Sequence, residues 1–241
     1  MSDASVGISE KDQKVRARKN LTYLLLFSIV MFFVALSSAY VVSQSSADFW
    51  VHFRIPKAFL YSTAVIIASS IAIQFALVSI RKGKVSAATG LLVVTLLLGG
   101  AFTLNQRSGW YELMSRGYFM VGKVMASGGE YGTDYTISRK GIDLQKVGGQ
   151  FYLPSDLQHV KPVNAEMEDY QNTASSYFYI LTVGHWVHLA GGLVVLMILT
   201  FKALRGRYSA EDHTGIWQGT MYWHFLGGLW VYLLLFIAFV H

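Results

Sequence analysis

The stretch YFYILTVGHWVHLAGGLVVLMILTF, residues 177–201, is almost entirely apolar yet contains His185 and His188. At about 1.5 Å per residue, a helix of this length crosses the roughly 30 Å hydrocarbon core of a bilayer. A second such stretch, WQGTMYWHFLGGLWVYLLLFIAFV at 217–240, contains His224. Histidine is costly in hydrocarbon, so we expect these three rings to face other helices or internal water. The two stretches therefore predict transmembrane helices that pack together.

Three further apolar runs lie at residues 21–42, 58–80 and 85–104. Backbone groups in lipid must bond within the chain, so each run is expected to form a helix. The first run is longer than the roughly 7–15 apolar residues of a signal peptide, and we expect a retained anchor. The fold class predicted is an all-α membrane protein with five transmembrane helices.

The composition supports this class. Hydrophobic residues make up 53% of the chain and charged residues 14%, and the mean hydropathy is +0.40. A water-soluble domain would be difficult to solvate at these values. The net charge of +6 could suggest a nucleic-acid partner, but the cations cluster beside the apolar runs, which favours a role in membrane orientation. The chain contains no cysteine, so any metal would need histidine or carboxylate ligands.

The short loops predict the orientation of the helices. Three cationic clusters fall on the same side of the membrane, whereas segment 43–57 on the other side contains only two cations. The positive-inside rule therefore places the amino terminus in the cytoplasm and, after five crossings, the carboxyl terminus outside. The clustered cations are Lys11, Lys14, Arg16, Arg18, Lys19, Arg81, Lys82, Lys84, Lys202, Arg205 and Arg207.

The chain divides into four expected parts. A cytoplasmic tail at 1–20 precedes helices one to three at 21–104, and helices four and five occupy 177–241. Between them, residues 105–176 form an external polar segment in which EYGTDYTISRKG and GGQFYLPSD suggest short strands joined by turns. This extended segment is either a docking surface for a partner subunit or electron donor, or a solvated elaboration that caps the helices; the cap is the simpler expectation.

The histidines and glycines of the last two helices have two interpretations. Glycine permits close helix contact and histidine can bond to a neighbouring helix, which favours a packing seam. The alternative is metal or heme ligation, but one heme between His188 and His224 would require helix tilt, and only three of the seven histidines lie within the predicted spans. We expect no catalytic, cofactor-binding or metal-binding residue. The expected interhelical or cleft contacts are His185, His188, Trp223, His224, Gly184, Gly191, Gly192 and Gly228, with Arg205 and Arg207 as candidates for lipid phosphate contacts or plain orientation.

The motifs GHWVHLAGG and YWHFLGGLW, in this order, resemble the paired signatures of subunit III of the heme-copper cytochrome c oxidases. LTYLLLFSIVMFFVALSSAYVV, RIPKAFLYSTAVIIASSIAIQFA and GWYEL are similar to further segments of that family. Two departures touch the family's buried acids: Ile29 follows Ser28 where many relatives have glutamate, and Gly227 replaces an aspartate. A mechanism that carries protons on side chains of this chain is therefore not expected.

The resemblance implies the short five-helix bacterial form, with a V-shaped two-bundle arrangement, a lipid-filled cleft and residence in the bacterial inner membrane. It implies a non-catalytic subunit docked on oxidase subunit I, with subunit II and other respiratory subunits as further partners and phospholipid as a bound component. The heme and copper that reduce oxygen to water and pump protons would lie in the partner subunits. No nucleic-acid partner is expected.

Three alternatives stay open at the level of sequence. The chain could belong to a quinol oxidase, or serve as an accessory subunit of a nitric oxide reductase, because it contains no donor site that separates them. A stand-alone cytochrome b would show a Soret band in the isolated polypeptide. A transporter would show broken helices and repeated halves, which are not visible here.

Overall fold

The computed structural model describes residues 10–241, without the side chains of residues 10–12 and 14. Residues 1–9 of the expected tail, and the side chains of Lys11 and Lys14, lie outside the described residues. Five helices in the described part are long and apolar enough to cross a membrane, so the chain is an integral membrane protein. They are α1 (Glu10–Ser46), α2 (Lys57–Arg81), α3 (Val85–Ser115), α5 (Thr173–Leu204) and α6 (Thr214–Val240).

The long helices extend beyond the apolar runs. Helix α3 continues from the apolar run that ends at residue 104 to Ser115, through Arg107 and Glu112. Helical hydrogen bonding does not require an apolar side chain, so polar residues can continue a helix past the hydrocarbon region. Part of the expected external segment is therefore a helical extension of the bundle.

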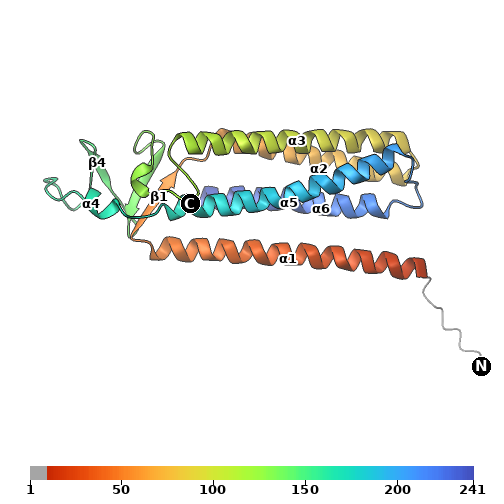
Figure 1. Cartoon of the computed structure of the whole chain (residues 1–241), viewed down its shortest axis with the longest axis horizontal. Helices are drawn as coiled ribbons and strands as arrows, with labels where there is room; N and C mark the ends of the chain where they lie inside the picture. The colour runs from red at the N-terminus through yellow and green to blue at the C-terminus, as the bar shows by residue number, and fades with distance from the viewer. Residues whose placement is uncertain (1–9) are drawn as a thin grey trace, which may run out of the picture.

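The helices pack as two antiparallel pairs with α1 alongside (Figure 1). Helices α2 and α3 form one pair and α5 and α6 the other; α2 also contacts α6, and α3 contacts α5. Helix α1 lies against α5 and α6. Large aromatic side chains fill the interior, including Phe102, Trp223 and Trp230.

Three of the helices are followed by a glycine with a positive φ angle. Gly83, Gly117 and Gly206 follow α2, α3 and α5 with φ angles of 73°, 85° and 66°. After α2, the Gly83 N–H donates to the Ile80 carbonyl and the Lys84 N–H donates to the Ser79 carbonyl, at 3.0 Å each. This Schellman motif needs a positive φ that glycine adopts without strain. The glycines therefore fix where the chain turns back.

Strands gather at one end of the bundle (Figure 1). The expected strands in the external segment are confirmed, whereas the strand in segment 43–57 was not predicted. This strand, β1, pairs antiparallel with β2 from Phe49↔Arg139 to Phe53↔Tyr135. The elements at this end are β1 (Phe49–Phe53), η1 (Val124–Ala126), β2 (Tyr135–Arg139), β3 (Ile142–Asp143), β4 (Gln145–Val147), β5 (Gln150–Tyr152) and α4 (Asn164–Met167).

We call β1 together with residues 116–172 the cap. The cap has a buried interior of its own, which includes Val51, Tyr118, Ile137, Leu144 and Met167. Its residues are joined to the bundle through β1 and through the helices that enter and leave it. The cap is thus a packed layer over the helix ends, more than a loose loop.

Candidate functional site

Trp223 on α6 lies at the centre of the bundle and is 1% exposed. Its indole Nε1–H donates to Ser69 Oγ at 3.0 Å, and that hydroxyl donates to the Thr95 carbonyl at 3.2 Å. This short chain of bonds joins α6 to α2 and α2 to α3. Because each polar group is buried and paired, the three helices are held in one register.

Two glycines make room for the Trp223 ring. A Cβ atom at Gly99 of α3 would lie 2.8 Å from Trp223 Cη2 and 2.7 Å from Leu193 Cδ2. A Cβ atom at Gly192 of α5 would lie 2.9 Å from Leu226 Cδ1 and 3.4 Å from Trp223 Cζ3. Any larger residue would force these side chains to move. Gly192 and Gly99 therefore lie where side chains of neighbouring helices approach the backbone closely, and the motifs did not reveal Gly99.

His185 on α5 is fully buried. Its ring centroid lies 5.4 Å from that of Trp230 and 6.2 Å from that of Phe102, on α6 and α3. Neither ring nitrogen has a hydrogen-bond partner among the described residues, and the same holds for the buried side-chain amide of Gln106. We call the set His185, Phe102, Trp223, Trp230, Gly99 and Gly192 the inner seam. Within it, His185 contacts neighbouring helices by packing and not through a bond.

His188, one turn further along α5, has a different setting. Its Nδ1 lies 2.7 Å from the Gly184 carbonyl oxygen of its own helix, so Nδ1 carries the proton and donates. The ring packs on Phe33 of α1, with centroids 5.6 Å apart. The His188 carbonyl oxygen accepts a bond from the Tyr222 hydroxyl at 3.1 Å. His188 therefore links α5 to α1 by ring packing and to α6 through its backbone.

His224 on α6 is the intramembrane histidine whose ring bonds to another helix. Its Nε2 donates to Gln74 Oε1 of α2 at 3.0 Å. His224 is half-buried and Gln74 is exposed on the outer surface of the bundle. The three histidines thus do not converge on one point.

The remaining expected glycines differ from one another. Gly184 faces Phe33 of α1, where a Cβ atom would meet ordinary contact at 3.8 Å. Gly191 and Gly228 are exposed, and a Cβ atom on either would have nothing within 4 Å. Both lie on outward faces of their helices, and the expectation that they permit close approach stays a prediction.

Arg205 and Arg207 follow α5 at the end of the molecule opposite the cap. The Arg205 guanidinium lies 4.1 Å above the Phe201 ring. Both arginines line a hollow of about 370 Å³ with Met197, Ile198, Phe201 and Lys202. The hollow combines cations at its mouth with apolar walls.

A cluster of polar contacts at the cap end was not predicted. The Phe53 N–H of β1 donates to His241 Nε2 at 3.1 Å, so in the neutral ring Nδ1 donates to the Tyr40 hydroxyl, 2.6 Å away. The His52 Nδ1 lies 2.7 Å from the His241 carbonyl oxygen. Burial, reinforced by the nearby His52, lowers the pKa of His241 to about 3. The neutral imidazole therefore ties α1 and β1 to the end of α6.

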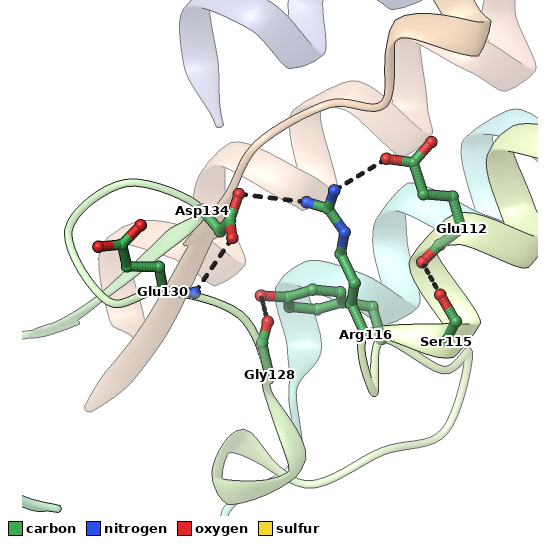
Figure 2. Close-up of polar contacts among 7 residues, drawn as sticks. Glu112, Ser115, Arg116, Gly128, Glu130 and Asp134 are labelled. Carbon is green, nitrogen blue, oxygen red and sulfur yellow. Dashed lines mark hydrogen bonds and ion pairs between the residues drawn. The ribbon is translucent and has the colours of Figure 1, made fainter.

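Arg116, just after α3, joins the bundle to the cap through two ion pairs (Figure 2). Its guanidinium lies 2.9 Å from Glu112 Oε1 and 3.4 Å from Asp134 Oδ1. Asp134 also accepts the Glu130 N–H at 3.1 Å. Figure 2 shows Arg116 between the two carboxylates, one from α3 and one from the loop before β2. The half-exposed network orients this loop over the helix ends.

Metal ligation finds no support in this geometry. Among residues 10–241, apart from the few undescribed side chains, no group of three or more histidine, cysteine, aspartate or glutamate residues could hold a metal ion. Ile29, at the position of the family's glutamate, is buried, and a Cβ atom at Gly227 would lie 3.0 Å from Ser70 Oγ. The arrangement of the site is that of a packing core with polar links between helices.

The chain is similar in sequence to known proteins. A model of the family "Cytochrome c oxidase subunit III" matches residues 151–241, which include both histidine-containing helices. A "Probable cytochrome c oxidase subunit 3" of Nocardia farcinica is 25% identical over 228 residues, which cover 91% of this chain and 86% of the relative. The chain is therefore similar to the cytochrome c oxidase subunit III family over most of its length.

Two other subunit III relatives differ in how much of this chain they match. One from Mycobacterium leprae is 23% identical over 227 residues, again 91% of this chain and 86% of the relative. One from Thermostichus vulcanus is 32% identical over 63 residues, which are 26% of this chain and 31% of the relative. The Nocardia and Mycobacterium relatives thus align with most of this chain, as the resemblance to the subunit III family predicted.

Proposed function

We propose that this chain is the non-catalytic subunit III of a bacterial cytochrome c oxidase. It docks on the catalytic subunit I within the membrane, stabilises that subunit and binds phospholipid. Subunit II and further respiratory subunits complete the assembly. The heme and copper that reduce oxygen to water, and the machinery that pumps protons, belong to the partner subunits.

The observation that carries this proposal is the use made of the three intramembrane histidines. His185 is enclosed by aromatic rings, His188 donates to its own helix, and His224 pairs with Gln74. A heme held between helices needs histidines that face one another across a common space. The three rings are instead part of the packing, which supports a structural role.

The absence of acidic side chains from the apolar runs supports a passive role in proton movement. Residues 21–42, 58–80, 85–104, 177–201 and 217–240 contain no aspartate or glutamate. Serine, threonine and glutamine can hydrogen-bond but hold no titratable charge at neutral pH. Proton transfer is therefore assigned to the catalytic subunit.

Phospholipid is proposed to bind beside Arg205 and Arg207. Lys202, Arg205 and Arg207 provide positive charge for a phosphate, and Met197 and Phe201 provide an apolar wall for an acyl chain. The cationic loops set the orientation, with the amino terminus in the cytoplasm and the cap outside the bacterial inner membrane. The V-shaped two-bundle arrangement stays a prediction of the resemblance.

The test is affinity purification of the tagged chain from its native membrane in mild detergent, with identification of every copurifying subunit. We expect a heme-bearing catalytic subunit in equal amount, together with a subunit that carries a dinuclear copper motif. A heme-bearing partner without that copper subunit would indicate a quinol oxidase or nitric oxide reductase instead. Recovery of the chain as a lone oligomer would contradict the proposal.

The lipid assignment has its own test. Phospholipid retained by the purified complex is measured for the double variant Arg205→Gln, Arg207→Gln, and for the control Arg81→Gln, Lys82→Gln at the other cytoplasmic turn. We expect loss of bound lipid in the first variant alone. Equal lipid content in both variants would mean that Arg205 and Arg207 contribute to orientation only and do not bind lipid.

A further inference from the structure

A second hollow lies on the outward surface between α2 and α6. Its volume is about 430 Å³. We call it the outer groove and define it by the residues that matter most: Ile67, Ile71, Gln74, His224, Gly227 and Gly228. None of these residues belongs to the inner seam.

The groove contains an exposed polar pair at bilayer depth. Gln74 lies seven residues before Arg81, the last residue of α2, which is about 10 Å along the helix axis. The Gln74 carbonyl accepts from His224 Nε2 at 3.0 Å. Among the described residues, the amide nitrogen of Gln74 has no hydrogen-bond partner. The two N–H groups of this amide therefore lack an acceptor within the described part of the chain, in the apolar run 58–80 that is expected to lie in hydrocarbon.

The middle of the groove is lined by glycine. Gly228 is exposed and a Cβ atom there would meet nothing within 4 Å, while Gly227 lies against Ser70. The side chains beside them, Ile67 and Ile71, are 48% and 52% exposed. Gly228 exposes backbone on the outward face of α6. Lipid gains little by contacting such backbone, whereas a second helix gains close contact.

An acyl chain would fill the glycine-lined part but not the polar end. Hydrocarbon offers no acceptor, and an unsatisfied amide in lipid costs several kcal/mol. A protein helix can satisfy both parts, with a carbonyl, hydroxyl or amide oxygen at Gln74 and a bulky apolar side chain over the glycines. The complementarity of the groove in both hydrogen bonding and shape thus favours a protein occupant.

A third hollow, of about 630 Å³, differs from the outer groove in the charge of its lining. It lies between α1, α5 and α6, and its lining includes Arg18 and Lys202 near the cytoplasmic end. A cationic mouth suits an anionic headgroup, whereas the outer groove has no charged residue in its lining. The two hollows therefore call for different occupants.

We propose that the outer groove is the face on which this chain docks to a transmembrane helix of the heme-bearing catalytic subunit. The docking helix places an oxygen acceptor against the Gln74 amide and a large apolar side chain over Gly227 and Gly228. This inference rests on the proposed function, because it names the face through which the subunit binds its partner.

The test is photo-crosslinking in the intact native complex, with benzoyl-phenylalanine at position 228 and, as a control, at position 100. Gly100 of α3 lies at a similar depth, and a Cβ atom there also has nothing within 4 Å. We expect an adduct between position 228 and a transmembrane peptide of the heme-bearing subunit, identified by mass spectrometry, and none from position 100. An adduct of position 228 with phospholipid alone or with a second copy of this chain, no adduct at position 228, or equal adducts from both positions would overturn the inference.

A second measurement uses assembly strength. Gly228→Leu and Gln74→Leu are each expected to lower the fraction of this chain that stays in the complex by at least tenfold during detergent titration, with Gly100→Leu unchanged. Isolated Gly228→Leu and Gly100→Leu should unfold at the same detergent concentration as the parent chain, because a Cβ atom at either site meets nothing within 4 Å. Gln74→Leu also removes the bond to His224 and should unfold slightly earlier. Unchanged retention of both groove variants would contradict the proposal.

Failure of this inference differs from failure of the proposed function. If the chain purifies with the heme-bearing subunit but crosslinks to it through another face, only the groove assignment falls. If no heme-bearing subunit copurifies, the proposed function itself falls.

Discussion

The inner seam and the outer groove are built from the same residue types but differ in what fills the space beside their glycines. In the seam, Trp223, Leu193 and Leu226 of this chain occupy the room left by Gly99 and Gly192. In the groove, Gly228 faces open space and the polar pair Gln74 and His224 faces outward. The seam is therefore complete within one polypeptide, whereas the groove has the character of half an interface.

This difference shows that a histidine–glycine motif alone does not determine whether its residues pack within the chain or face a partner. AGG at 190–192 and LGG at 226–228 look alike, and within each pair the two glycines differ: Gly192 and Gly227 are buried, whereas Gly191 and Gly228 are exposed. The helix face on which each glycine falls decides whether it serves folding or association. Substitutions in the two regions should thus separate stability from assembly.

Truncation of Trp223 should give the largest effect on folding. Trp223→Ala removes the bond to Ser69 and leaves a cavity between four helices, so we expect a loss of about 4 kcal/mol in the free energy of unfolding. Sodium dodecyl sulfate titration of the purified chain measures it. The control is Trp217→Ala, a half-buried ring near the end of the bundle opposite the cap, with an expected loss below about 1 kcal/mol. Similar losses for both would show that the seam is not the stabilising centre.

A larger side chain at Gly99 of the inner seam should lower the free energy of unfolding slightly less than truncation of Trp223 does. Gly99→Val places methyl groups into Leu193 and Trp223, and overpacking of this kind costs about 3 kcal/mol. The neighbour Gly100→Val has open surroundings and should be neutral. Thermal unfolding of the two variants compares them directly, and equal melting temperatures would refute the close packing at Gly99.

Acidification should lower the free energy of unfolding through His241, at the cap end of the bundle. The pKa of His241 is lowered to about 3 from 6.5, so the unfolded chain binds more protons than the folded chain between these values. The stability that depends on the neutral ring is fully present above pH 6.5 and is lost as the pH falls toward 3, by about 2 kcal/mol between pH 6.5 and 4.5. Thermal unfolding across this range measures the slope. His241→Phe should make the slope shallower by the share of that ring, and an unaltered slope in that variant would place the titrating group elsewhere.

Replacement of His185 should change the free energy of unfolding least, and should raise it where the other substitutions lower it. Its ring nitrogens are buried without partners among the described residues, so His185→Leu exchanges an unpaired polar ring for an apolar side chain of similar size. We expect a gain of about 1 kcal/mol in the free energy of unfolding. The same titration applied to His224→Leu should show no gain, because His224 is paired with Gln74. A marked loss in His185→Leu would mean that the ring makes a bond the packing does not reveal.

The sequence predicted the five helices because span length and hydropathy are local properties of the chain. It also indicated that His185, His188 and His224 face protein. It did not separate their three environments, because these depend on which side chains neighbouring helices contribute. A closer reading of α3 could have found Gly99, since it lies at helical spacing from the buried Thr95, Phe102 and Gln106.

The cap was harder to predict for a physical reason. Strand β1 pairs with β2, which lies more than 80 residues further along the chain, and nothing in FWVHF alone names its partner. The bonds of His241 to Tyr40 and Phe53 likewise join residues that meet only after all five helices have packed. Such contacts are set by tertiary structure and not by local pattern.

The central claim is that the rings of this subunit hold helices together and bind no redox centre, and an absorption spectrum tests it most directly. The chain is separated from its purified complex under conditions that keep it helical, and heme absorbance and metal content are measured for each fraction. We predict that the Soret band and the copper stay with the partner subunits while this chain is colourless. A Soret band in the separated chain that shifts on substitution of His188 or His224 would contradict the account.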